Sequence, residues 1–163
     1  MGHGYEFKCK CGYSFSPFLG VGFLFPKEYK NLKDSALNGK FGKELKSFFS
    51  EHTDGALDAR KVVVKCKKCG DYSCVPKLSM YLPKPKEKMK KNKWSAAMPF
   101  EGEEYVAPWE LSKSYTLFAK YQHKCKTCDG DMVIVPEKTL EKNGIVCPRC
   151  GKSVSCGGVI MWD

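Results

Sequence analysis

The chain has 163 residues, ten of them cysteine, and a formal net charge of +10. This size suits one domain or two small ones, and two small ones would each bury too little apolar surface to be comfortably stable alone. No apolar run approaches the ~20 residues of a membrane helix, and the first residues contain no hydrophobic signal core. We therefore expect a cytoplasmic protein whose cysteines, in C-x-x-C spacing, hold metal and do not form disulfides.

In chain order, the first predicted elements form a β lobe with a helical insert. Residues 5–15 alternate aromatic and polar side chains around a cysteine turn, which indicates strand, turn and strand. Residues 26–53 predict two helices, because Pro26 fits a first helical turn and the apolar side chains that follow recur at helical spacing. We expect these helices to cover the β-strands.

Strand patterns return after this insert, at residues 61–65 and 72–82, where Pro76 confines the second strand to a sheet edge or a bulge. Residues 1–83 are thus predicted as a first lobe. Residues 84–104 contain six lysines and have a proline at their second position, which predicts a linker or loop.

Residues 105–163 predict a second lobe. Pro108 suggests a helix start, and residues 115–121 fit either helix or strand. Two further cysteine turns and the strands beside them complete the lobe. The expected fold class is α+β, with two antiparallel β lobes, the first carrying a two-helix insert.

Eight cysteines form four close pairs, each followed within two residues by glycine. A tetrahedral metal needs four thiolates, so two such turns complete one site and four turns complete two. The pairs are Cys9/Cys11, Cys66/Cys69, Cys125/Cys128 and Cys147/Cys150. Cys74 and Cys156 remain, and their strand positions favour small buried side chains over reactive thiols.

The spacing of the turns suggests which ones share a metal. Eighteen residues separate Cys128 from Cys147, a compact spacing, so the last two pairs are expected to form one site. By elimination, the first two pairs form the other, although 54 residues lie between Cys11 and Cys66. A crossed arrangement that joins Cys66/Cys69 to Cys125/Cys128 remains open.

The turns Cys66-Lys-Lys-Cys69-Gly70 and Cys147-Pro148-Arg149-Cys150-Gly151 resemble the knuckles of the zinc-ribbon superfamily. The first lobe also resembles uncharacterised bacterial proteins of the CpXC type, although Cys9-Lys-Cys11 lacks their proline and one residue. The resemblance implies a zinc-binding module with two structural Zn²⁺ ions and no assigned activity. Because many zinc ribbons belong to nucleic-acid-processing machinery, it also favours nucleic-acid partners. Cys-Pro-x-Cys-Gly further resembles rubredoxin, so an iron electron carrier is the minor alternative.

The composition fits two kinds of interaction module. The sequence contains no recognisable catalytic motif, so we do not expect an enzyme. Each Zn(Cys)4 site carries a charge of −2, so two sites lower the net charge from +10 to about +6 (+10 − 4). This charge favours nucleic acid or a ribonucleoprotein as the leading partner, without base specificity because only two of 28 basic residues are arginine. The candidate contact residues are Lys84, Lys86, Lys88, Lys90, Lys91 and Lys93. The alternative is a protein adapter with an exposed aromatic patch built from Trp94, Phe100, Tyr105 and Trp109.

Overall fold

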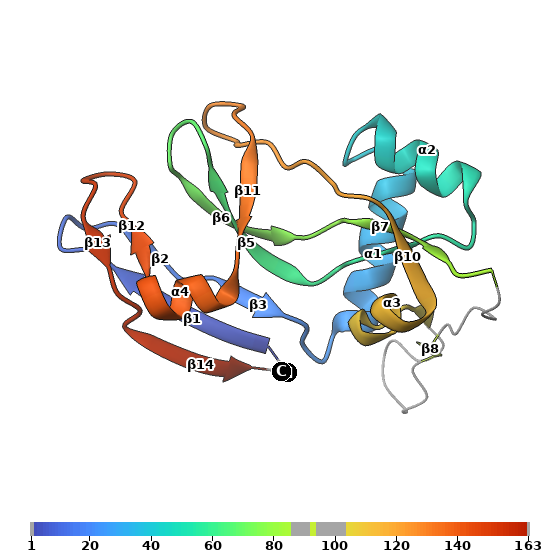
Figure 1. The fold of residues 1–163 in the computed structure, drawn as a ribbon, viewed down its shortest axis with the longest axis horizontal. Helices are drawn as coiled ribbons and strands as arrows, with labels where there is room; N and C mark the ends of the chain where they lie inside the picture. The colour runs from blue at the N-terminus through green and yellow to red at the C-terminus, as the bar shows by residue number, and fades with distance from the viewer. Residues whose placement is uncertain (1, 86–91, 94–103, 163) are drawn as a thin grey trace. The chain divides into compact units, whose positions relative to one another are not determined.

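The computed structural model describes residues 2–85, 92–93 and 104–162 (Figure 1). Its antiparallel sheets and four helices in that described part confirm the α+β class. The chain divides into two compact units, each assembled from separated segments. The metal unit comprises Met1–Gly22, Lys61–Pro76 and Gln122–Asp163, and the helical unit comprises Phe23–Arg60 and Lys77–Tyr121.

This division differs from the predicted lobes at 1–83 and 105–163. Strands from both predicted lobes join in the metal unit, and the helical insert of the first lobe joins part of the second in the helical unit. Most of the predicted linker, 84–104, lies outside the described residues.

The metal unit is built on one antiparallel sheet in the order β11-β5-β3-β1-β14, with β2 paired to β1 and β6 paired to β5. Its strands are β1 (Gly2–Lys8), β2 (Ser14–Phe15), β3 (Phe18–Gly20), β5 (Lys61–Cys66), β6 (Tyr72–Pro76), β11 (Met132–Val135) and β14 (Gly158–Trp162). A separate ribbon joins β12 (Ile145–Val146) to β13 (Ser153–Val154), and α4 spans Glu137–Asn143.

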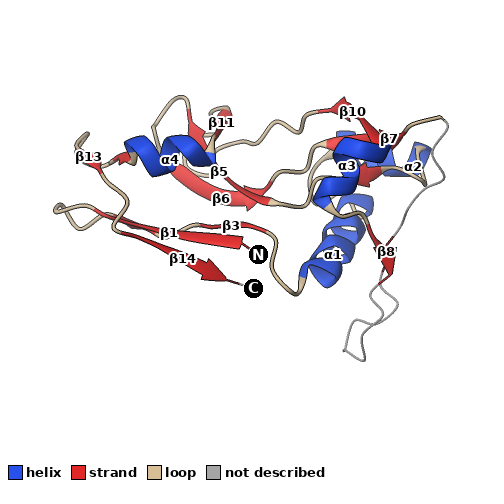
Figure 2. Cartoon of the chain, turned by 60° about the horizontal axis from the view of Figure 1, so that its bottom comes forward, coloured by secondary structure: helices blue, strands red, loops and turns tan. Residues whose placement is uncertain are grey.

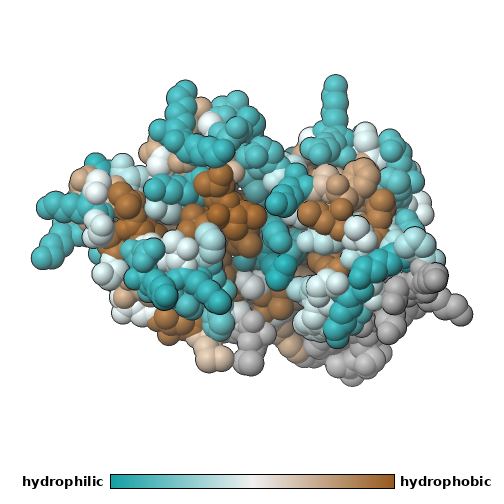
Figure 3. Space-filling model, in the orientation of Figure 1, coloured by the Kyte–Doolittle hydropathy of each residue, from teal (hydrophilic) through white to brown (hydrophobic). Residues whose placement is uncertain are grey.

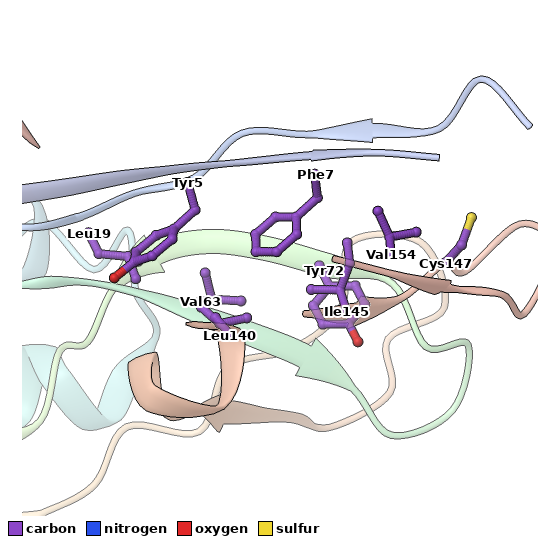
Figure 4. Close-up of a cluster of buried hydrophobic side chains, with 9 residues drawn as sticks. All are labelled: Tyr5, Phe7, Leu19, Val63, Tyr72, Leu140, Ile145, Cys147 and Val154. Carbon is purple, nitrogen blue, oxygen red and sulfur yellow. The ribbon is translucent and has the colours of Figure 1, made fainter. Parts of the chain in front are cut away.

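The core of the metal unit lies between β1 and α4. Tyr5 and Phe7 extend from β1 toward Val63 and Leu140, as Figure 4 shows, and all four side chains are at most 2% exposed. The Tyr5 hydroxyl lies 2.7 Å from Glu137 Oε1 and 2.9 Å from Glu141 Oε1, and its one proton, donated to either carboxylate or shared between them, ties α4 to the sheet. The alternating aromatics predicted at residues 5–15 therefore bury one face of β1, as strand periodicity requires.

The helical unit places three helices around two small sheets (Figure 2). Its helices are α1 (Phe25–Leu37), α2 (Lys43–Glu51) and α3 (Pro108–Ser114). Its strands are β4 (Ala56–Leu57), β7 (Met80–Pro83) and β10 (Tyr115–Ala119) in one sheet, and β8 (Asn92–Lys93) and β9 (Glu104–Tyr105) in another.

Both predicted helices of the insert are confirmed. Pro26 lies in the first turn of α1, and the buried face of α2 consists of Leu45, Phe48 and Phe49. The strand predicted at 72–82 is broken, because Leu78 has a left-handed φ of 58° and separates β6 from β7. Residues 115–119 form a strand.

A buried ion cluster holds the start of β7 to the segment after β4. The side chain of Asp58 is 0% exposed, and it accepts hydrogen bonds from Arg60 Nε at 2.9 Å, Arg60 Nη2 at 2.6 Å and Lys77 Nζ at 3.0 Å. Backbone bonds join Asp58 N to Ser79 O and Leu78 N to Asp58 O. Burial alone would raise the pKa of Asp58, but the two cations outweigh it and lower the pKa. Asp58 is therefore an ionised anchor of the helical unit.

Candidate metal centres

Eight cysteines of the metal unit gather into two clusters of four. One cluster contains Cys9, Cys11, Cys147 and Cys150, and the other contains Cys66, Cys69, Cys125 and Cys128. Within each cluster all four Sγ atoms lie within 4.8 Å of one another. Each cluster can hold one metal ion, so the expectation of two tetra-cysteine sites is confirmed.

The grouping of the turns corrects the one expected from spacing. The first turn joins the fourth, and the second joins the third, which is the crossed arrangement. Strand pairing explains it, because β5 and β11 are antiparallel with Cys66 opposite Met132, so each strand carries its cysteine turn at the same end. We call this cluster the inner site and the other the outer site.

The sulfur positions of the inner site suit a tetrahedral ion. Cys66 Sγ lies 3.4 Å from Cys128 Sγ, and Cys69 Sγ lies 3.6 Å from Cys125 Sγ. A Zn–S bond of about 2.3 Å places sulfurs at the corners of a tetrahedron with edges of roughly 3.8 Å. The four thiols therefore already stand close to the spacing that a bound ion needs.

Backbone N–H groups support the thiolates of the inner site. The amides of Lys68 and Cys69 donate to Cys66 Sγ at 3.3 and 3.4 Å. The hydrogen bond from the Cys69 amide is the largest of the causes that lower the pKa of Cys66, to about 6. The backbone N–H of Asp71 lowers the pKa of Cys69, but burial and the neighbouring thiols together outweigh it and raise that pKa to about 12. A metal ion would displace the protons that this cluster otherwise keeps.

Three of the turns have a glycine in the left-handed region directly after the second cysteine: Gly12, Gly70 and Gly151, with φ of 88°, 77° and 71°. In the third turn this position is Asp129, with φ of 55°. Gly130, one position after Asp129, has a steric role instead. A Cβ atom there would lie 3.1 Å from Cys66 Sγ and 3.3 Å from Cys128 Sγ, so glycine leaves room for the sulfurs.

The outer site contains the short Cys9-Lys10-Cys11 turn, for which the sequence predicts a different backbone path. Its closing bond runs from Gly12 N to Cys9 O, over three residues, whereas Gly70 N bonds Cys66 O and Gly151 N bonds Cys147 O over four. The turn still places its thiols correctly, since Cys9 Sγ lies 3.5 Å from Cys150 Sγ and Cys11 Sγ lies 3.5 Å from Cys147 Sγ. The shorter turn therefore provides two ligands.

The remaining cysteines have a packing role. Cys74 and Cys156 are partly buried against the core of the metal unit. Cys74 Sγ donates to Phe18 O at 3.3 Å, and burial raises the pKa of its thiol. A thiol held in its protonated form is a poor nucleophile.

Metal binding would leave the two units with different charges. The metal unit has 12 basic and seven acidic residues, a net charge of +5, and the helical unit has 16 and 11, also +5. Two Zn(Cys)4 sites would contribute −4 and lower the metal unit to about +1. Some lysines beside the cysteines are also paired, as Lys124 Nζ is with Asp131 at 2.8 Å.

Of the predicted lysine contact residues, only Lys84 has a described side chain. Its Nζ donates to the carbonyl of Lys113 at 2.5 Å. Lys93 belongs to β8, and its side chain is outside the described set. Lys86, Lys88, Lys90 and Lys91 lie outside the described residues.

The predicted aromatic patch is only partly described. Trp94 and Phe100 lie outside the described residues, and Tyr105 is partly buried against Phe25. Trp109 is 57% exposed. It lines an open hollow of about 390 Å³ together with Arg60, Tyr81, Pro108, Leu111 and Ser112. Sequence reasoning found the tryptophan but not the arginine beside it, which is 49 positions earlier and carries no local motif.

Comparisons with known proteins identify no relative: no family model, no curated protein and no solved structure matches the chain. Among the described residues, none of the helices has the length and apolar character needed to cross a membrane.

Proposed function

We propose that this protein is a non-catalytic interaction module whose metal unit is held together by two structural zinc ions. The arrangement of four thiolates at each centre supports this proposal. A catalytic zinc keeps one coordination position for water or substrate, and four cysteines leave none. Zinc binding of this kind contributes on the order of 10 kcal/mol to folding, which a unit of this size needs.

Metal analysis and a visible spectrum test the first half of the proposal. We expect about two zinc ions per purified chain and no visible absorption, since zinc has a filled d shell. Removal of the metal by a tight chelator should unfold the metal unit, so that its backbone amides lose their protection from hydrogen exchange. A coloured protein with stoichiometric iron would support the rubredoxin-like electron carrier instead, and metal-free material with an intact fold would contradict both.

The hollow beside Trp109 favours a protein partner for the helical unit. Exposed tryptophan, arginine and tyrosine are the side chains that most often dominate protein interfaces. The hollow offers all three, and Asp58 holds the guanidinium of Arg60 in place. Lys77 pairs with the same carboxylate, so the cluster of Asp58, Arg60 and Lys77 has a net charge of +1. We propose that a partner segment with a carboxylate beside an apolar side chain binds here.

Selection from a random peptide library on the zinc-loaded protein tests this surface. Selected peptides should contain Asp or Glu next to an apolar residue, and Trp109→Ala should weaken them by about tenfold or more. Leu117→Ala is the matched control, because Leu117 is 43% exposed on β10 and lies outside the hollow. Peptides without acidic residues, or equal losses for the two variants, would count against this partner.

Nucleic acid is the second candidate partner, and the charge distribution favours the helical unit as its contact. With zinc bound, that unit retains +5 of the total of about +6. Affinity for single-stranded RNA should fall steeply as salt rises. Replacing Lys86, Lys88, Lys90 and Lys91 by Gln should weaken binding more than replacing Lys8, Lys10, Lys126 and Lys152. Salt-independent binding would exclude this candidate.

A further inference from the structure

Strand β14 of the metal unit has a free edge that combines unbonded backbone groups with exposed apolar side chains. β14 is the last strand in the order of its sheet, and among the described residues only β1 pairs with it (Figure 1). The side chains of Val159, Ile160 and Met161 are 57%, 59% and 63% exposed. An edge strand that offers both hydrogen-bonding groups and apolar side chains is a template for another strand.

The register of β1 shows which backbone groups of β14 face the free edge. Tyr5 N donates to Pro17 O, on the side of β1 that faces β3. Tyr5 and the residue opposite it, Val159, therefore form a non-hydrogen-bonded pair, and the N–H and C=O of Val159 point away from β1. Strand alternation gives Met161 the same direction, whereas Ile160 bonds to β1.

Other edges are protected against such pairing. Of the described strands longer than two residues, β6, β10 and β11 also lie at sheet edges. A bulge follows Leu117 in β10, and Pro76 lies in β6. On β11, Met132 N donates to His123 O, so the chain itself covers part of that edge. Bulges, prolines and covering segments are the features by which proteins prevent edge pairing, and residues 158–162 contain no proline and no charged side chain.

A second copy of β14 matches the backbone of this edge. When two copies pair antiparallel about a two-fold axis at Ile160, Val159 of each copy lies opposite Met161 of the other. The outward groups of these residues then meet, so each Val–Met pair exchanges both of its N–H···O bonds. Ile160 lies opposite the partner's Ile160 in a non-hydrogen-bonded pair, the kind in which side chains come closest.

The side chains and the charge of the metal unit favour the same pairing. Ile160 lies opposite Gly4, and Gly4 lies opposite Phe18, so the two apolar side chains share one face of the sheet. The Phe18 ring, 46% exposed, covers Gly4. Pairing at Ile160 joins this apolar surface to its copy and removes part of it from water. With zinc bound the metal unit has a charge of only about +1, so two copies of it repel each other little.

We propose that the protein forms a homodimer in which the two β14 strands pair antiparallel and join the sheets of the two metal units into one. The second copy is the occupant that fits, because the edge and its partner must present outward backbone groups in the same alternation and apolar side chains on both faces. This interface is separate from the Trp109 hollow and does not depend on the partners proposed above.

Sedimentation equilibrium of the zinc-loaded full chain tests the dimer. An interface of two short strands is small, so we expect a Kd on the order of 10 μM. Ile160→Lys should weaken dimerisation at least about tenfold, because two ammonium groups would face each other across the axis. Ile134→Lys is the matched control, since Ile134 is 45% exposed on β11, at the opposite end of the same sheet. A protein that stays monomeric far above 10 μM would overturn the proposal, and equal losses in the two variants would replace it with pairing of β11 to β14.

Met161→Pro tests the strand pairing separately from the apolar contact. Because the Met161 N–H points away from β1, proline removes a hydrogen bond of the dimer and none of the metal unit itself. Dimerisation should weaken by about tenfold while the zinc content stays unchanged, and Met161→Leu, which keeps the N–H, should dimerise like the wild type.

The register has its own test. In a mixture of isotope-labelled and unlabelled protein, an NOE should connect the α proton of Ile160 to that of the partner's Ile160, because α protons approach closely in a non-hydrogen-bonded pair. A dimer that survives Met161→Pro, or that lacks this NOE, would show that another surface joins the copies, and the proposal would fail.

Discussion

The sulfur atoms of Cys66 and Cys128 lie 3.4 Å apart although 62 positions separate them in the chain. Between these residues the chain leaves the metal unit at Pro76, forms much of the helical unit, and returns at Gln122. The outer site encloses the inner one in sequence, because its cysteine turns come first and last. The two centres therefore fasten three separate segments of chain into one unit.

The nested pairing predicts which double substitutions remove one metal and which remove two. Cys69→Ser and Cys125→Ser each take a ligand from the inner site, so the double variant should still bind one zinc per chain. Cys125→Ser with Cys147→Ser damages both sites and should bind none tightly. Native mass spectrometry of the refolded variants measures the stoichiometry. The opposite pattern would restore the pairing expected from sequence spacing.

That expectation fails for a reason that spacing cannot reveal. The 18 residues between Cys128 and Cys147 hold β11 and α4, and the pairing of β11 with β5 joins the third turn to the second. Helix α4 is missed because it has seven residues and a single buried apolar side chain, Leu140, so it produces no helical period. The cysteine turns can be predicted from the sequence because each is a motif of a few neighbouring residues. The pairing of the turns cannot, because it depends on which strands pair, and β5 and β11 are far apart in the chain.

The same distinction applies to the helical unit. The periodic apolar positions of α2 predict its buried face correctly. Apolar surface still remains exposed on both units (Figure 3), with Phe118 on β10 54% exposed and Ile160 on β14 59% exposed. The break at Leu78 could not be predicted, because a left-handed leucine has no turn signature and is kept by the bonds around Asp58.

Gly130→Ala should weaken metal binding at the inner site. The added Cβ would lie 2.9 Å from Lys68 Cβ and 3.1 Å from Cys66 Sγ, so the sulfur must move from its tetrahedral position. We expect a loss of at least about tenfold in zinc affinity, the order found when groups that orient a ligand are disturbed. Competition with a chromogenic chelator measures it. Gly158→Ala is the control, because a Cβ there meets nothing within 4 Å, and an equal loss in both variants would refute the steric argument.

Asp129→Gly should stabilise the zinc-loaded protein. Asp129 holds the left-handed position that glycine holds in the other three turns. A residue with a Cβ is strained there, and removing that strain should exceed the extra entropy that glycine has in the unfolded chain, for a net gain of about 0.5–1 kcal/mol. Guanidinium unfolding at saturating zinc measures the change. Gly70→Ala makes the opposite kind of change in the second cysteine turn and should destabilise the protein by about 1–2 kcal/mol. If neither substitution changes stability, the cysteine turns relax freely and the left-handed position carries no strain.

Asp58→Asn should destabilise the helical unit in a way that depends on pH. The lowered pKa of Asp58 means that its ion cluster stabilises the fold fully above the unfolded pKa of about 3.9 and loses that effect as pH falls through the folded value. Replacing the carboxylate leaves Arg60 and Lys77 without their shared anion. Because their side chains are 42% and 25% exposed, water limits the loss of stability to about 2–4 kcal/mol at pH 7.

Hydrogen exchange of the Leu78 amide measures this loss. That amide lies in the helical unit, so its exchange reports opening of this unit and not the release of metal from the metal unit in acid. The difference in unfolding free energy between wild type and Asp58→Asn should shrink as the pH falls toward the pKa of Asp58 in the folded protein. Asp34→Asn is the control, because Asp34 is exposed on α1 and its replacement should change stability little. A difference that stayed constant with pH would mean that shape, and not charge, makes Asp58 necessary.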